Sequence, residues 1–239
     1  MTYKIHPYWK LEKFVSPAEH SVDKPHLNVS LLSHHIPKTA GSSLRGAYEK
    51  AIGRRRVFGI YANTGASEMS TGKDIWVPRG AQILHGHFRP HPHHQKMFPN
   101  AMSAVWVRDP IERIWSLVGH LLALREKHPH YSFLKNAKLN ANLESQESIV
   151  HAMITTDALN EFTHTYSSYF SAVPIRNFSF VGSKHKFEND LNRLSDMVGV
   201  NLKVLYLNKR SNQSAPIPAK IRNLEQYLSD EYEIVSNYL

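Results

Sequence analysis

Residues 27–44 read LNVSLLSHHIPKTAGSSL and combine an apolar run with a loop of small residues. Residues 28–36 are rich in apolar and β-branched side chains, which is typical of a buried strand. After Pro37, small side chains would allow backbone N–H groups to approach an anion, and a helical pattern begins near Ser43. The stretch therefore predicts a strand, an anion-binding loop and a helix, with Ser42 and Ser43 as candidate caps of that helix.

The predicted loop also carries one full positive charge, on Lys38. In the general phosphate-binding loop, G-x-x-x-x-G-K-[ST], the lysine follows the second glycine. Here Lys38 precedes Gly41, the single glycine of the loop. This order departs from the loop of ordinary nucleotide-binding proteins.

A second apolar run, residues 101–107, leads into RDPIERIWS at residues 108–116. An Asp-Pro pair is typical of a helix start, so a second strand followed by a helix is expected. Arg108 would lie at the end of this strand, with Ser116 two helical turns later. The planar, permanently charged guanidinium suits a phosphate. The simpler alternatives are an ordinary helix start at Asp109 and a surface ion pair at Arg113.

These two motifs resemble those of sulfotransferases that use 3'-phosphoadenosine 5'-phosphosulfate (PAPS). PKTAGSS is similar to the family's 5'-phosphosulfate loop, whose usual form is close to PKTGGTS, and RDPIERIWS is similar to its 3'-phosphate motif. The resemblance is to carbohydrate sulfotransferases of the heparan sulfate 2-O-sulfotransferase type and to soluble bacterial-type relatives. Ala40 stands where the family commonly has glycine, and a positive φ there would strain the loop.

The resemblance implies PAPS as cofactor, adenosine 3',5'-bisphosphate (PAP) as product, and no metal. Lys38 would neutralise charge on the bridging oxygen. A basic loop at residues 208–214 is similar to the one that the family folds over its cofactor, although a plain surface loop is the alternative. The implied cofactor-binding residues are Lys38, Thr39, Ala40, Gly41, Ser42, Ser43, Arg108, Ser116, Lys209 and Arg210.

A third apolar run, AQILHGHF at residues 81–88, ends with His85 and His87, which period two places on one face of a strand or just beyond it. Histidine suits proton transfer because its ordinary pKa is near neutral. The 2-O-sulfotransferase group has a similar HGH, which implies His87 as the catalytic base with His85 supporting it. Alternatively, together with the histidines at 91, 93 and 94 they form a polar loop or an adventitious zinc or nickel site.

The chain has 239 residues, 41% of them hydrophobic, which predicts a single domain over residues 1–239 with an irregular lead-in at residues 1–26. The formal net charge of +9 attracts anions such as a polyanionic cofactor, an acidic glycan, nucleic acid or a membrane surface. Charge alone does not choose among these. The absence of cysteine excludes disulfides and thiolate metal sites.

The N-terminal residues lack the apolar core of a signal peptide, and no segment approaches 18 uninterrupted apolar residues. Eukaryotic members of the family that this chain resembles are anchored in the Golgi membrane. Because this sequence shows no such anchor, a soluble cytoplasmic enzyme is expected, with a removed anchor as the alternative. No nucleic-acid partner is expected, and the oligomeric state stays open.

Alternating strands and helices predict an α/β fold with a largely parallel sheet and helices on both faces. The resemblance implies the three-layer, P-loop-like sulfotransferase fold. Further strands are expected at residues 57–61, 177–182 and 202–207, a loop at 62–80, and helices at 43–52, 110–127, 144–153, 158–170, 186–198 and 218–239.

The expected function is transfer of a sulfuryl group to a hydroxyl, with a carbohydrate, glycolipid or other glycoconjugate as acceptor. A small alcohol or a peptidyl tyrosine would leave the cofactor motifs unchanged. Two other classes remain open: a P-loop kinase-like phosphotransferase, and a non-enzymatic basic module that binds polyanions.

Overall fold

The computed structural model describes residues 4–137, 139, 141–156, 159–205 and 216–239, and the chain divides into two compact units. Unit 1 contains the described residues up to Val107 and those from Phe170 to residue 205. Unit 2 contains the described residues of Arg108–Tyr169 and those from residue 216 onward. The expectation of a single domain stays a prediction.

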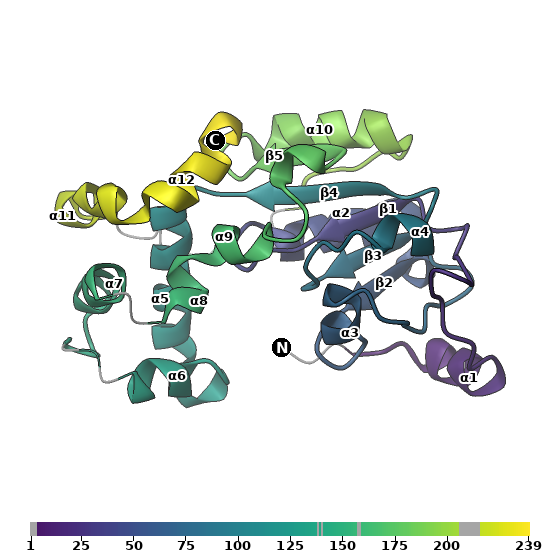
Figure 1. The fold of residues 1–239 in the computed structure, drawn as a ribbon, viewed down its shortest axis with the longest axis horizontal. Coiled ribbons are helices and arrows are strands. Elements are labelled where there is room, and N and C mark those ends of the chain that lie inside the picture. Colours follow the sequence, from purple (N-terminus) through teal and green to yellow (C-terminus); the bar gives the residue numbers. More distant parts are fainter. Residues whose placement is uncertain (1–3, 138, 140, 157–158, 206–215) are drawn as a thin grey trace. The chain divides into compact units, whose positions relative to one another are not determined.

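Unit 1 is built on a five-stranded, wholly parallel sheet in the order β2-β3-β1-β4-β5 (Figure 1). The α/β class and the parallel sheet flanked by helices are therefore confirmed. Residues 202–205, which were expected to form a strand, do not form one, and residues 206–207 lie outside the described residues. The strands are β1 (Leu31–His34), β2 (Val57–Ile60), β3 (Ile83–Gly86), β4 (Met102–Val107) and β5 (Phe180–Ser183).

Helices cover both faces of this sheet. Neighbouring residues of a strand point to opposite faces, and each face packs in a core of its own. Leu31 and Ile83 pack in one core with α2 (Gly41–Ile52) and α10 (Phe187–Val198). Leu32 and Leu84, one residue further along, pack in the other core with α1 (Pro7–Val15), α3 (Ala66–Ser70) and α4 (His94–Met97). Unit 1 thus has the three expected layers. Two 3-10 turns, η1 (Arg54–Arg56) and η3 (Ile175–Asn177), precede β2 and β5.

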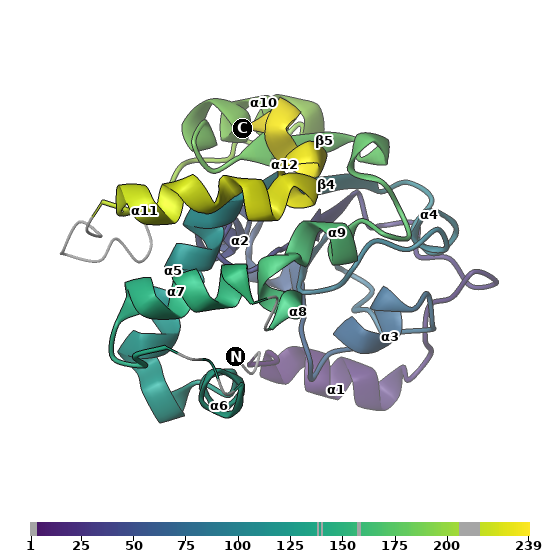
Figure 2. The same ribbon diagram turned by 60° about the vertical axis from the view of Figure 1, so that its left-hand side comes forward.

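Unit 2 is helical in its described part and has its own hydrophobic core, in which α5 supplies Ile111, Ile114 and Val118. The segment from residue 219 to the C-terminus runs as a series of short helices and 3-10 turns (Figure 2). The helices and turns are α5 (Pro110–Leu124), η2 (Arg125–Lys127), α6 (Tyr131–Asn136), α7 (Gln146–Thr155), α8 (Asn160–Thr163), α9 (Thr165–Tyr169), α11 (Ala219–Arg222), η4 (Asn223–Leu228), α12 (Ser229–Val235) and η5 (Ser236–Tyr238).

Several local expectations were wrong. The lead-in contains α1, whose Trp9 is buried, and the predicted loop at 62–80 contains α3. The helices expected at 158–170 and 218–239 are each divided into shorter pieces. None of the helices in the described ranges is both long enough and apolar enough to cross a membrane.

Candidate active site

The loop after β1 lies at the topological switch point of the sheet. From β1 the chain moves to β2 and β3 on one side, and it then crosses to β4 and β5 on the other. Ligands of open parallel sheets bind beyond the carboxyl ends of the strands at such a point. The loop at residues 35–40 follows β1, and Arg108 follows β4 in the chain.

The loop backbone alternates in handedness. Lys38 has a φ of 75° and Ala40 has a φ of 79°, whereas the intervening Thr39 has no positive φ. Successive N–H groups in such an alternating backbone form a concave anion-binding nest. Ala40 also immediately precedes α2, and the N–H groups in the first turn of a helix have no partner within it. This geometry suits an anion of the size of a phosphate or a sulfate.

The hydroxyl side chains of Thr39, Ser42 and Ser43 lie in different environments. Thr39 is buried, and its Oγ1 donates to the carbonyl of Ile36 at 2.8 Å, so that this side chain closes the loop on itself. The predicted capping by Ser42 and Ser43 is wrong, because Ala40 is the N-cap residue and makes no side-chain cap bond. The helix begins at Gly41, earlier than predicted, which places both serines inside its first turn.

The left-handed backbone at Ala40 leads to a prediction about stability. An L-residue in this region costs about 1–2 kcal/mol, whereas glycine adopts it without steric cost. Ala40→Gly should therefore raise the free energy of unfolding by roughly 0.5–1 kcal/mol, after the greater flexibility of glycine in the unfolded chain is subtracted. Urea unfolding measures the change. The control Ala51→Gly, in the last turn of α2, should lower stability. If Ala40→Gly also lowers stability, the backbone at Ala40 is not strained.

Gly41 has a separate steric role. A Cβ atom on Gly41 would lie 2.0 Å from Nε2 of His35, so the imidazole occupies the space of the missing side chain. His35 is thereby packed against the start of α2. The first residue of the loop is in this way brought next to the residue that follows its last one.

Three histidines gather at the carboxyl ends of β1 and β3. The rings of His35 and His85 stack with centroids 5.3 Å apart, and the rings of His35 and His87 meet almost perpendicularly at 4.5 Å. His87 is exposed and also contacts the ring of Tyr61 at 5.0 Å. The sequence predictions of His85 and His87 omitted His35. Its position near the end of the strand pattern at residues 28–36, two residues before Pro37, was a signal for it.

The side chain of His85 is hydrogen-bonded to a chain of two hydroxyl groups. Its Nδ1 lies 2.9 Å from Oγ of Ser33, which lies 3.1 Å from the hydroxyl of Tyr48 on α2. All three side chains are buried. The position of His85 is therefore fixed by contacts within the core of unit 1.

Burial keeps the two inner histidines neutral. It lowers the pKa of His85 to about 3, with further lowering by the charges of His87 and Arg45. Burial likewise lowers the pKa of His35 well below its usual value, and repulsion from Lys38 and from the protonated forms of His87 and His85 acts in the same direction. At neutral pH neither ring competes with Lys38 for an anion. The exposed His87 is the member of the cluster that a substrate can reach.

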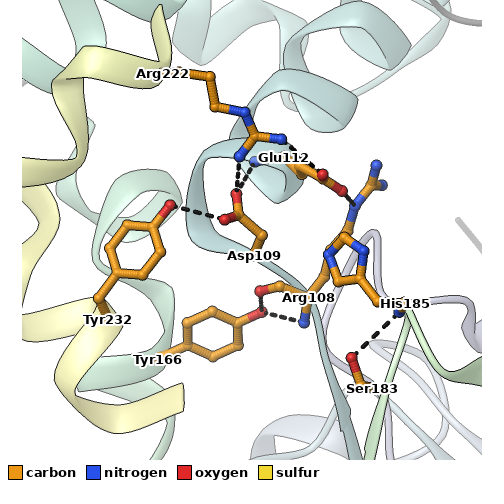
Figure 3. A network of polar contacts seen from close by, with 8 residues as sticks. All are labelled: Arg108, Asp109, Glu112, Tyr166, Ser183, His185, Arg222 and Tyr232. Atoms are coloured by element: carbon orange, nitrogen blue, oxygen red, sulfur yellow. Dashed lines mark hydrogen bonds and ion pairs between the residues drawn. The ribbon is translucent and has the colours of Figure 1, made fainter. Parts of the chain in front are cut away.

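Arg108, the first residue of unit 2, is fixed through both its backbone and its side chain. The hydroxyl of Tyr166 accepts from the Arg108 N–H at 2.9 Å and donates to the Arg108 carbonyl at 2.7 Å (Figure 3). The Arg108 Nε donates to Oε2 of Glu112 at 3.2 Å, one helical turn along α5. The turn after β4 therefore has a defined conformation.

A second arginine completes this ion network. Arg222 donates to Oδ1 of Asp109 at 2.9 Å and to Oε1 of Glu112 at 2.7 Å. The hydroxyl of Tyr232 donates to Oδ2 of Asp109 at 2.9 Å, as Figure 3 also shows. Asp109 caps α5 as expected, because its carboxylate accepts from the N–H of Glu112 at 2.8 Å. The sequence motif indicated the cap but not the distant partners Arg222 and Tyr232.

The other residues of the second motif differ in accessibility. Arg113, considered as a surface ion pair, is instead 1% exposed, and its guanidinium donates to the carbonyls of Phe162 and Thr163. Burial lowers the pKa of this guanidinium. Ser116 is half-buried on α5. Lys209 and Arg210 lie outside the described residues.

The histidines after β3 show no metal site. His94 is buried with its Nε2 at 2.8 Å from the carbonyl of Met69, which is a structural contact. Within the part of the chain that the structure describes, no group of three or more His, Asp or Glu side chains is arranged to hold a metal ion.

Comparisons with known proteins give matches in structure only. No family model matches the sequence, and no curated protein matches it. The crystal structure of a sulfotransferase from Alicyclobacillus acidocaldarius is similar over 87% of this chain and 94% of that chain, with 12% sequence identity and a TM-score of 0.43. The crystal structure of mouse sulfotransferase SULT7A1 complexed with PAP is similar over 88% of this chain and 85% of that chain, with 10% identity and a TM-score of 0.48. At these identities and TM-scores the similarities do not by themselves assign an activity to this chain.

Proposed function

We propose that this chain is a sulfotransferase that moves a sulfuryl group from PAPS to a hydroxyl group of an acceptor. One observation carries the proposal. The nest formed around Lys38 and Ala40, at the start of α2, adjoins a histidine cluster at the carboxyl edge of a parallel sheet. An anion site beside a candidate base is what transfer of a charged group requires.

The chain offers groups for both ends of the cofactor. The nest and Lys38 would hold the 5'-phosphosulfate, because both supply positive potential where that group carries negative charge. The side chains proposed for the 3'-phosphate are Arg108 and Ser116, by their match to the family's motif. Thr39 acts by keeping the loop closed. Lys209 and Arg210 are proposed as further phosphate contacts from the same resemblance.

The residues then divide the chemistry between them. PAPS, when bound, supplies the sulfuryl group and a stable leaving group. His87 takes the proton of the acceptor hydroxyl as the oxygen forms its bond to sulfur. Lys38 meets the negative charge on the oxygen whose bond to sulfur breaks. Transfers of this kind depend mainly on positioning and electrostatic stabilisation.

The acceptor that we propose is a hydroxyl of a carbohydrate or another glycoconjugate. The support is the HGH sequence at residues 85–87, which is similar to that of the 2-O-sulfotransferase group. An acceptor screen with simple sugars, sulfated glycans and phenols would test it once cofactor binding is established.

Calorimetric titration with PAP tests the cofactor assignment. PAP should bind, and 5'-AMP should bind much more weakly because it lacks the 3'-phosphate. Arg108→Ala should weaken PAP binding by about ten- to a hundredfold, the value of a charge-assisted hydrogen bond, while leaving 5'-AMP unaffected. Removing Arg108 does not strand Glu112, which keeps its bond to Arg222.

Arg176→Ala is the matched control, because Arg176 is an exposed arginine in the 3-10 turn before β5. It should leave the affinity for PAP unchanged. Binding of ATP as tight as that of PAP would favour a kinase-like protein instead. Equal loss of PAP and 5'-AMP affinity in Arg108→Ala would remove this residue from 3'-phosphate recognition.

A further inference from the structure

Helix α1 presents an apolar ridge to solvent. Leu11 is 62% exposed, Phe14 is 84% exposed and Val15 is 70% exposed. Their spacing of i, i+3 and i+4 places all three on one side of the helix. Large apolar side chains exposed together in this way mark an interaction surface more often than single exposed residues do.

The ridge is held in place by contacts on the opposite side of the helix. Trp9 is 2% exposed and packs edge-on against Phe58 at 5.2 Å. Beyond the helix end, the carbonyl of Ser16 accepts from the indole of Trp76 at 2.8 Å. Glu12 accepts from the N–H of Arg79 at 2.6 Å. The exposed side chains therefore project from a helix that is fixed to the body of unit 1.

Basic side chains lie on α1 and on the segments beside it. Lys10 and Lys13 lie on α1 itself, and both are exposed. A groove of about 530 Å³ beside the helix is lined by Leu11 and Val15 together with Arg55, Arg56 and Arg79. A second groove of about 520 Å³ adds Lys4 and Arg54. The guanidinium of Arg55 lies over the ring of Tyr8 at 4.7 Å, which holds this charge beside the helix.

We propose that this surface docks onto a lipid bilayer that carries anionic headgroups. The apolar ridge of Leu11, Phe14 and Val15 would enter the boundary between headgroups and acyl chains. The lysine and arginine side chains beside it would contact lipid phosphates. Charge complementarity favours a bilayer as the occupant, because cations border the apolar ridge while the acidic Glu12 is bonded to backbone. The combination of an apolar stripe and flanking lysine and arginine is typical of interfacial helices.

The place of this surface in unit 1 fits such docking. Arg54–Arg56 precede β2 and Arg79 precedes β3, so these arginines lie near the amino ends of the two strands. The anion-binding loop and the histidine cluster lie at the carboxyl ends. Docking through α1 would leave the anion-binding loop and the histidine cluster of unit 1 uncovered.

Vesicle co-sedimentation tests the proposal with the whole chain. The protein should bind vesicles of mixed phosphatidylcholine and phosphatidylglycerol and should bind pure phosphatidylcholine much more weakly, with affinity falling as salt rises. The double variant Leu11→Ser, Phe14→Ser should lower the partition coefficient by at least about tenfold. Lys10→Ser with Lys13→Ser should lower it and flatten its salt dependence.

The matched control is Phe133→Ser, since Phe133 is half-exposed on α6 and is not one of the residues that define the surface. It should bind vesicles as the unchanged protein does. Phe14→Trp adds a direct measurement, because brominated lipids should quench the new indole if position 14 inserts. Absence of vesicle binding, equal binding to neutral vesicles, or concentration-dependent self-association that Phe14→Ser abolishes would each overturn the proposal. The affinity for PAP should be the same in all these variants. The membrane-docking proposal and the proposed sulfotransferase function can therefore be refuted independently of one another.

Discussion

Lys38→Ala is expected to lower the turnover number for sulfuryl transfer by about a hundred- to a thousandfold. Lys38 is the full positive charge of a loop whose other anion-binding groups are backbone N–H groups. Its ammonium is proposed to meet charge that develops on the leaving oxygen, and removal of such a group acts mainly on the chemical step. Steady-state kinetics with PAPS and a working acceptor would measure the loss.

The same variant should change PAP affinity much less than turnover, because the nest and the start of α2 still face the anion. Lys38 has a φ of 75°, a strained value for alanine, so Lys38→Gly should be measured beside it to separate lost charge from altered backbone. Lys50→Ala, at an exposed lysine in the last turn of α2, is the control and should keep full activity. Near-normal turnover in both variants of Lys38 would refute its assigned role.

His87→Ala is expected to lower turnover by about a hundred- to ten-thousandfold while leaving PAP binding intact. His87 is exposed, whereas His35 and His85 beside it are kept neutral by burial. A base that removes the acceptor proton acts only when the acceptor is present, so cofactor affinity should not depend on it. Kinetics and calorimetry on the same preparation would separate the two effects.

His93→Ala supplies the comparison, because His93 is an exposed histidine of the same stretch of sequence and its ring contacts that of His91 at 4.8 Å. It should retain full turnover. If His87→Ala turns over normally, the proton must leave by another route. If it also loses PAP binding, the residue belongs to the cofactor site instead.

The sequence predicted the strands of the sheet well where an apolar run was followed directly by residues that end a strand. The runs ending at residues 36, 88 and 107 each contain a strand, and α2 ends at Ile52, where the predicted helix at residues 43–52 ends. The wrong elements are those whose stability depends on distant contacts. Helix α1 is short, and it is held by packing of Trp9 against Phe58, which no local pattern of residues reveals.

The same distinction between local pattern and distant contacts explains which features of the candidate site were predicted. The loop after β1 has the expected position, and the expected strain at Ala40 coincides with its φ of 79°. His35 was missed because its contact with Gly41 depends on the three-dimensional course of the loop. Arg113 was misjudged, because its charge suggested the surface whereas two backbone carbonyls hold it inside. The assigned chemical roles stay predictions.

The ion network of unit 2 has a consequence for how Arg108 would exchange partners. A phosphate that approaches this guanidinium competes with a carboxylate already in place, since Glu112 lies 3.2 Å from its Nε. The displaced carboxylate is not left unpaired, because Arg222 donates to its other oxygen at 2.7 Å. An uncompensated charge would make such an exchange costly. With a second arginine present, Arg108 can change partners while every charge of the network keeps a counter-charge.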